Sequence, residues 1–180
     1  YISIEEGQTI DAKSIGLAIV GSGRIGSLRA QLASGHPAVR FIAVSDQKRE
    51  NARNLADKVG AQVYSSDNNE VIEHPDVNAV IVSTSEGEHV EPLVRAIELG
   101  KRVLVEKPIA LTLADADRVI QAIEKTGADV RIGYSRRYKD RYLLAKEQIL
   151  QGRIGQPIGG AARVRVRQTY ENVEKVALEA

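Results

Sequence analysis

The chain has 180 residues, a formal net charge of +1 and no cysteine. This length is enough for one full domain and part of a second, with a core large enough to be stable without cross-links. The absence of cysteine excludes disulfides, a thiolate zinc site and a cysteine nucleophile. The three histidines (His36, His74 and His89) are too far apart in the sequence to form a metal-ligand motif, so we expect no metal.

Short apolar runs alternate with helical segments along most of the chain. The strand candidates are Ile15–Val20, Phe41–Val44, Gln62–Tyr64, Ala79–Val82, Val103–Val105 and Val130–Tyr134. The helix candidates are Arg24–Ala33, Arg49–Val59, Glu88–Leu99 and a helix that Thr112 caps and that runs through Lys125. Continuous apolar runs favour strands that are covered on both faces, and the alternation implies right-handed crossovers. We predict an α/β domain with a doubly wound parallel sheet over residues 15–135, after an N-terminal extension of residues 1–14.

The pattern changes after Gly133. A helix is predicted over Tyr138–Gln151, and the turn-rich segment Gly152–Gly160 follows it. The segment Ala162–Arg167 then alternates between apolar and basic residues, which is typical of a strand in an open antiparallel sheet. We predict that residues 136–180 begin a second, α+β open-sheet substrate domain, which is incomplete in this sequence. An exposed edge of such a sheet favours pairing with another chain, so we expect a homo-oligomer.

Positive charge is concentrated in the last third of the chain. From Arg131 to Arg167 there are ten lysines and arginines against two acids, so this stretch carries +8 and the remainder −7. Such a stretch fits a nucleic acid, an anionic ligand, a partner surface or a solvated face. Its tyrosines match no RNA-binding signature, so we expect no nucleic-acid partner.

The sequence favours a cytoplasmic protein without a membrane segment. No apolar run reaches the length of a membrane span. Residues 1–8 have neither the basic start nor the apolar stretch of a signal peptide.

A glycine-rich motif follows the first predicted strand. Residues 20–26 read Val-Gly-Ser-Gly-Arg-Ile-Gly and fit G-x-G-x-x-G at the start of a predicted helix. In a dinucleotide-binding Rossmann domain the first glycine allows the tight turn, the second lets the pyrophosphate approach and the third lets helix and strand pack closely. Free amides and the positive helix end then face the phosphates. We predict cofactor binding by Gly21, Gly23, Arg24, Ile25 and Gly26, with an ordinary tight turn as the alternative.

Asp46 ends the second predicted strand, twenty residues after Gly26. A carboxylate at this place binds the hydroxyls of the adenosine ribose and repels a 2′-phosphate, so we expect NAD as the cofactor. Lys48 and Arg49 follow closely and weaken this preference, which leaves NADP open. The alternative role for Asp46 is that of a helix N-cap, which is compatible with ribose binding.

A second motif extends from the fourth predicted strand to the fifth. Residues 83–89 read Ser-Thr-Ser-Glu-Gly-Glu-His, and a helix ending in Gly100-Lys101 leads to a strand that runs into Glu106-Lys107-Pro108. The sequence Gly-Tyr-Ser-Arg-Arg-Tyr follows at residues 133–138. With the glycine motif, these features resemble the N-terminal part of the Gfo/Idh/MocA family (glucose–fructose oxidoreductase and inositol dehydrogenase), over roughly residues 15–167.

The resemblance implies NAD(P)-dependent oxidation or reduction of a sugar, an inositol or a related polyol. Glu106 would lie near the nicotinamide ribose, and Lys107 would contact the cofactor and act as the catalytic residue on the substrate hydroxyl. Ser83, Thr84 and His89 would lie along the nicotinamide half of the cofactor. The Lys107–Pro108 bond is often cis in this family. Tyr134 would contact the substrate, and so would Arg136, because it follows the last predicted strand and a guanidinium suits an acidic sugar or a substrate phosphate.

The position of Lys107 agrees with this role on physical grounds. It follows a predicted strand, and ligands of parallel sheets bind beyond the carboxyl ends of the strands. Beside the positive nicotinamide ring its protonated form is disfavoured, which suits proton transfer. The alternatives are a surface lysine paired with a neighbouring acid for Lys107, a capping or packing side chain for His89, and helix-surface charge for Arg136.

The sequence departs from the family pattern after the predicted Rossmann domain. The family's second domain normally supplies an aspartate and a histidine to the proton relay, but no histidine follows His89 and no aspartate follows Asp140. We therefore expect the substrate half of the site to be absent from this sequence. The main hypothesis is a dehydrogenase acting on CH–OH groups. The alternatives are a non-catalytic NAD-binding regulatory or sensor module, and a Rossmann reductase of another class acting on an imine or aldehyde, against which Glu-Lys-Pro argues.

Overall fold

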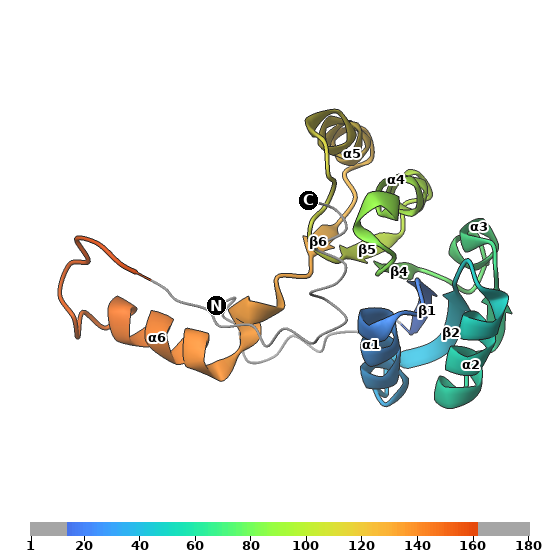
Figure 1. The fold of residues 1–180 in the computed structure, drawn as a ribbon, viewed down its shortest axis with the longest axis horizontal. Helices are drawn as coiled ribbons and strands as arrows, with labels where there is room; N and C mark the ends of the chain where they lie inside the picture. Colours follow the sequence, from blue (N-terminus) through green and yellow to red (C-terminus); the bar gives the residue numbers. More distant parts are fainter. Residues whose placement is uncertain (1–13, 162–180) are drawn as a thin grey trace, which may run out of the picture. The chain divides into compact units, whose positions relative to one another are not determined.

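The computed structural model describes residues 14–161, which form two compact units that divide between Tyr134 and Ser135. The first unit is built on a six-stranded sheet with the order β3-β2-β1-β4-β5-β6 (Figure 1). Its strands are β1 (Ile15–Val20), β2 (Val39–Ser45), β3 (Val63–Ser65), β4 (Ala79–Val82), β5 (Arg102–Val105) and β6 (Val130–Ile132). Every neighbouring pair is parallel. The chain thus forms the doubly wound Rossmann sheet that the apolar runs predict, with the change of direction at β1.

Helices cover both faces of this sheet (Figure 1). They are α1 (Arg24–Ser34), α2 (Arg49–Val59), α3 (Asn68–Ile72), α4 (Val90–Glu98) and α5 (Leu113–Thr126), together with the 3₁₀ turn η1 (Glu86–Glu88). Side chains alternate along the central strands β1 and β4. The odd-numbered residues pack against α1 and α2, and the even-numbered residues pack against α3, α4 and α5. Burial on both faces explains why the strand sequences are continuously apolar.

Two local predictions need correction. The helix predicted over Glu88–Leu99 begins later, because Glu88 closes the 3₁₀ turn by donating its amide to the Ser85 carbonyl. Helix α3 was not predicted, since five residues are too few to show a helical period. It forms because Val71 and Ile72 are buried, and because the side chain of Asp67 accepts a hydrogen bond from the Asn69 amide at the N-cap.

The other helix ends follow the sequence signals. Thr112 caps α5 by accepting a hydrogen bond from the Asp115 amide over 3.1 Å. Helices α2 and α5 end at Gly60 and Gly127, whose φ angles of +69° and +68° lie in the left-handed region.

The second unit contains the 3₁₀ turn η2 (Ser135–Tyr138) and helix α6 (Asp140–Leu150). The predicted helix over Tyr138–Gln151 is therefore slightly shorter in the structure. The strand predicted over Ala162–Arg167 lies outside the described residues, so the sheet of a second domain stays a prediction. Within residues 14–161, no helix combines the length and apolar character needed to cross a bilayer.

Candidate cofactor and active site

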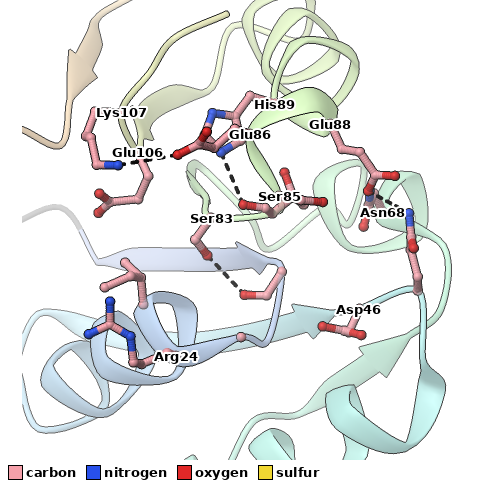
Figure 2. Close-up of a pocket in the computed structure, with 15 residues that line it drawn as sticks. Arg24, Asp46, Asn68, Ser83, Ser85, Glu86, Glu88, His89, Glu106 and Lys107 are labelled. Atoms are coloured by element: carbon pink, nitrogen blue, oxygen red, sulfur yellow. Dashed lines mark hydrogen bonds and ion pairs between the residues drawn. The ribbon is translucent and has the colours of Figure 1, made fainter. Parts of the chain in front are cut away.

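A cavity of about 430 Å³ lies at the carboxyl ends of β1, β2, β4 and β5 (Figure 2). This is the edge of a doubly wound sheet where the strand order reverses and ligands bind. The cavity is lined by most of the residues that the sequence predicts for the cofactor: Gly21, Gly23, Arg24, Ile25, Asp46, Ser83, Thr84, His89, Glu106 and Lys107. The fold thus brings together, around one cavity, predicted residues that extend from Gly21 to Lys107.

The three glycines of the first loop have three different environments. Gly21 has a φ of +95°, and a Cβ there would lie 2.7 Å from the carbonyl group of Ser83. A Cβ on Gly26 would lie 1.8 Å from the carbonyl oxygen of Gly21, so helix α1 packs directly on the loop. At Gly23 a Cβ would meet no atom within 4 Å. Open space at the second glycine, and not at the others, is the arrangement that pyrophosphate approach requires.

The first turn of α1 is suited to bind an anion. Gly23 is the N-cap residue, and no side chain caps the free amides of the first turn. No acidic residue lies in that turn, and Arg24 adds a positive charge at the cavity wall. The helix dipole and the uncapped amides therefore favour phosphate oxygens at this place.

Asp46 is held firmly at the end of β2. Its Oδ2 accepts a hydrogen bond from the Ser22 amide over 3.0 Å, and its Oδ1 accepts from the Lys48 amide and from Asn51 Nδ2 over 3.0 and 3.1 Å. The N-cap residue of α2 is Lys48, so the N-cap role considered for Asp46 is not the one that the structure shows. These three hydrogen bonds leave about one acceptor position of the carboxylate for a ligand hydroxyl.

Lys107 lies on the side of the cavity opposite Asp46 (Figure 2). Its Nζ is 3.5 Å from Oε1 of Glu86, and its side chain is 62% exposed. The lysine therefore lines the cavity and also forms the ion pair with a neighbouring acid that was the alternative reading. The Lys107–Pro108 bond is cis, as the resemblance implies.

His89 connects the loop after β4 to the loop after β5. The residue is 1% exposed, with Nδ1 of its ring 2.7 Å from the carbonyl oxygen of Pro108 and Nε2 3.2 Å from that of Thr84. Each ring nitrogen thus lies within hydrogen-bond distance of a backbone carbonyl oxygen, one in each loop. These contacts support the packing role that the sequence left open for His89.

The hydroxyl groups of Ser83 and Thr84, in the loop after β4, differ in their hydrogen bonding. Ser83 Oγ lies 3.1 and 3.0 Å from the carbonyl oxygens of Val20 and Gly21, which share its single hydroxyl proton. Thr84 Oγ1, by contrast, is buried without a hydrogen-bond partner among the described residues, and Thr84 lines the cavity. Buried polar atoms are rarely left unpaired, so this atom fits a site that a polar ligand completes. The residues therefore fit a dinucleotide.

Several lining residues were not predicted. Ser85, Glu86 and Glu88 follow β4, and the rule that ligands bind beyond strand ends would have found them. Two contacts made by lining residues were not predicted either. Arg29, on α1, donates to the Glu106 carboxylate, and Gln47 donates to the Glu88 carboxylate. Nothing in the local sequence indicates either of these two contacts, because each joins residues that are distant in the chain.

Of the three residues predicted for the substrate, one lines the cavity in the described part of the chain. Lys107 lines the cavity, whereas Tyr134, half exposed after β6, is not among the described residues that do so. Arg136 belongs to η2 in the second unit. Roles for Tyr134 and Arg136 with a substrate stay predictions.

Comparison with known proteins agrees with this geometry. The family model described as "Oxidoreductase family, NAD-binding Rossmann fold" (Gfo/Idh/MocA) matches residues 15–134. The chain is 34% identical to scyllo-inositol 2-dehydrogenase (NAD(+)) of Bacillus subtilis over 142 residues, which are 78% of this chain and 42% of that protein. It is 36% identical to inositol 2-dehydrogenase of Salmonella typhimurium over 152 residues, which are 83% of this chain and 44% of that protein.

The same relationship is seen in solved structures. The crystal structure of scyllo-inositol dehydrogenase from Lactobacillus casei, with bound NAD(H) and scyllo-inositol, superposes with a TM-score of 0.74 at 28% identity. The match covers 79% of this chain and 43% of that one. The chain spans less than half the length of the relatives it matches. Since the family model covers more than half of this chain, the chain belongs to the Gfo/Idh/MocA oxidoreductase family and carries its NAD-binding Rossmann domain.

Proposed function

We propose that this chain is the cofactor-binding part of an NAD-dependent dehydrogenase that acts on a hydroxyl group of an inositol or a related polyol. The observation that carries the proposal is that Lys107 and the glycine loop line one cavity. A group able to exchange a proton with a substrate hydroxyl therefore stands at the same edge of the sheet as the phosphate-binding turn.

The topology supports a proposed placement for the two halves of the dinucleotide in the cavity. In a doubly wound sheet the acid after the second strand binds the adenosine ribose, and the pyrophosphate lies at the glycine loop. Asp46 marks the adenosine side, so the nicotinamide half falls on the side of β4 and β5 (Figure 2). Glu106 and Lys107 lie on that side, next to the place where hydride transfer would occur.

The residues then have distinct chemical roles. Bound NAD supplies the hydride acceptor, and the protein supplies orientation and a path for the proton. In its neutral form, Lys107 Nζ would accept the proton of the substrate hydroxyl while the carbon that bears this hydroxyl gives its hydride to the cofactor, so that an alcohol becomes a ketone. Glu86 Oε1 lies 3.5 Å from Lys107 Nζ, so its carboxylate would stabilise the ammonium that forms when Lys107 has accepted the proton.

The relatives support the choice of substrate class. The proteins of Bacillus subtilis and Salmonella typhimurium are named inositol dehydrogenases, and the Lactobacillus casei structure contains scyllo-inositol. The non-catalytic NAD-binding module is the alternative.

The first experiment is an activity assay with the full-length natural protein, its mass confirmed by mass spectrometry. NAD is offered with scyllo-inositol, myo-inositol, hexoses and sugar acids, and the absorbance of reduced nicotinamide is followed. Reduction of NAD with an inositol is the expected result. Tight binding of NADH without turnover of any polyol would favour the non-catalytic module, and the absence of both would contradict the cofactor site.

The cytoplasmic location and the homo-oligomer also remain proposals from the sequence. Light scattering during gel filtration of the same protein gives its mass in solution. A mass equal to that of one chain would contradict the oligomer.

A further inference from the structure

One carboxylate on the nicotinamide side of the cavity is bound by an arginine from another element. Arg29, on α1, donates from Nε and Nη2 to Oε1 of Glu106, over 2.9 and 2.6 Å. The two side chains are only 26% and 13% exposed. Hydrogen bonds between charged groups are strong, and partial burial protects this pair from screening by solvent.

The backbone after β6 limits the same carboxylate on a second side. A Cβ on Gly133 would lie 2.8 Å from Cδ and from both oxygens of Glu106. The Gly133 amide is itself fixed by donating to the Val105 carbonyl over 2.7 Å. Glu106 is therefore held between an arginine on α1 and a glycine at the end of β6, so its carboxylate has little freedom to move.

Glu106 and Lys107 are adjacent in the sequence but form ion pairs with different residues. Lys107 Nζ contacts Glu86, whereas Glu106 Oε1 is taken by Arg29. Among the described residues, none donates a hydrogen bond to Glu106 Oε2, although Glu106 lines the cavity. One oxygen of a fixed carboxylate thus remains available for a donor on the ligand.

We infer that Arg29 is a positioning residue for the nicotinamide half of the cofactor site. It holds the Glu106 carboxylate away from Lys107 and orients Oε2 for a hydroxyl or amide of the bound nicotinamide nucleoside. The inference rests on the proposed function, because the topology of the NAD-binding domain assigns this side of the cavity to that half. Arg29 lies on α1, the helix that follows the phosphate loop, but it acts on the nicotinamide half of the ligand.

The chain contains a matched control for this ion pair. Arg95 donates from Nε and Nη2 to Oε1 of Glu73 over the same 2.9 and 2.6 Å. The side chains of Arg95 and Glu73 are 41% and 45% exposed, and neither residue lines the cofactor cavity. Arg95→Met therefore removes an ion pair of equal geometry without touching the site.

The test compares two ligands by isothermal titration calorimetry on the full-length protein. NADH contains both halves of the dinucleotide, whereas ADP has the adenosine and the pyrophosphate but lacks the nicotinamide nucleoside. We expect Arg29→Met to weaken NADH binding about tenfold, as for the loss of a hydrogen bond to a charged group, with ADP binding changed less than about twofold. Arg29→Lys restores part of the affinity for NADH, and Arg95→Met changes neither ligand.

Glu106→Gln keeps the size of the side chain and provides a second variant if Arg29→Met does not fold. It is expected to show the same selective loss of NADH binding. An equal loss of both ligands, or a lower melting temperature with unchanged NADH affinity, would show that the Arg29–Glu106 pair is only a structural link. A wild-type protein that binds neither NADH nor ADP would instead contradict the proposed function.

Discussion

The backbone amide of Ser22 donates a hydrogen bond to Oδ2 of Asp46 over 3.0 Å, which joins the turn after β1 to the end of β2. The carboxylate is therefore part of the phosphate loop's structure as well as the expected ligand of the adenosine ribose. A substitution at this position affects both roles together, and only a comparison of NADH with NADPH separates them.

We expect Asp46→Ala to weaken NADH binding by about tenfold or more, since a hydrogen bond to a charged group is lost. NADPH binding falls less, because removing the carboxylate also removes repulsion of the 2′-phosphate. Fluorescence titration of both nucleotides measures the difference. Asp57→Ala, at an exposed position of α2, is the control, and an equal loss for NADH and NADPH would contradict the ribose assignment.

Gly23→Ala is expected to fold normally but to bind NADH at least tenfold less tightly. The new methyl group meets no protein atom within 4 Å, so it does not disturb the fold. It occupies the space that the pyrophosphate needs at the second glycine of the loop. Thermal unfolding checks the fold, and NADH titration checks the affinity. Gly35→Ala, at the other end of α1 and also uncrowded, is the matched control. Unchanged NADH affinity in Gly23→Ala would place the phosphates elsewhere.

Gly26→Ala should show the opposite behaviour, with a large loss of stability. Its Cβ would lie 1.8 Å from the Gly21 carbonyl oxygen and 2.6 Å from Ser83 Oγ, so the backbone of the loop must move. We expect unfolding free energy to fall by about 3 kcal/mol, at the upper end for overpacked sites. Urea unfolding measures this change. A stability equal to that of the wild type would mean that the loop adapts easily.

Lys107→Met is expected to lower kcat with an inositol by about a hundredfold or more, the usual contribution of a general acid–base group. NADH affinity should change by less than about threefold, since the amine is needed for the proton and not for the phosphates. Steady-state kinetics and NADH titration provide the two numbers. Lys125→Met, in the last turn of α5, is the control. A variant that keeps full kcat would remove Lys107 from the proposed chemistry.

His89→Ala should destabilise the domain by about 3 kcal/mol, because it leaves a cavity at a buried position and removes the hydrogen bonding of the ring to the two loops. His36→Ala removes an exposed histidine and is the control. Urea unfolding distinguishes them. If His89→Ala is as stable as the wild type and loses only NADH affinity, His89 contacts the cofactor instead of packing the two loops.

The sequence by itself determined most elements of the Rossmann domain and the strand ends at which its cavity lies. The runs Ile15–Val20 and Ala79–Val82 are continuously apolar because their strands are buried on both faces, and that burial can be read residue by residue. The glycine pattern is equally local, since turn geometry, an uncapped helix start and close packing depend on a few consecutive residues.

Only the tertiary structure decided which side chains meet across that frame. Arg29 and Glu106 are 77 positions apart, and they meet because the order of the sheet brings α1 to the end of β5. His89 packs between the loops after β4 and β5 for the same reason. A periodic pattern reports whether a position is buried, but a hydrogen bond also needs a partner within about 3 Å, and only the folded chain provides it.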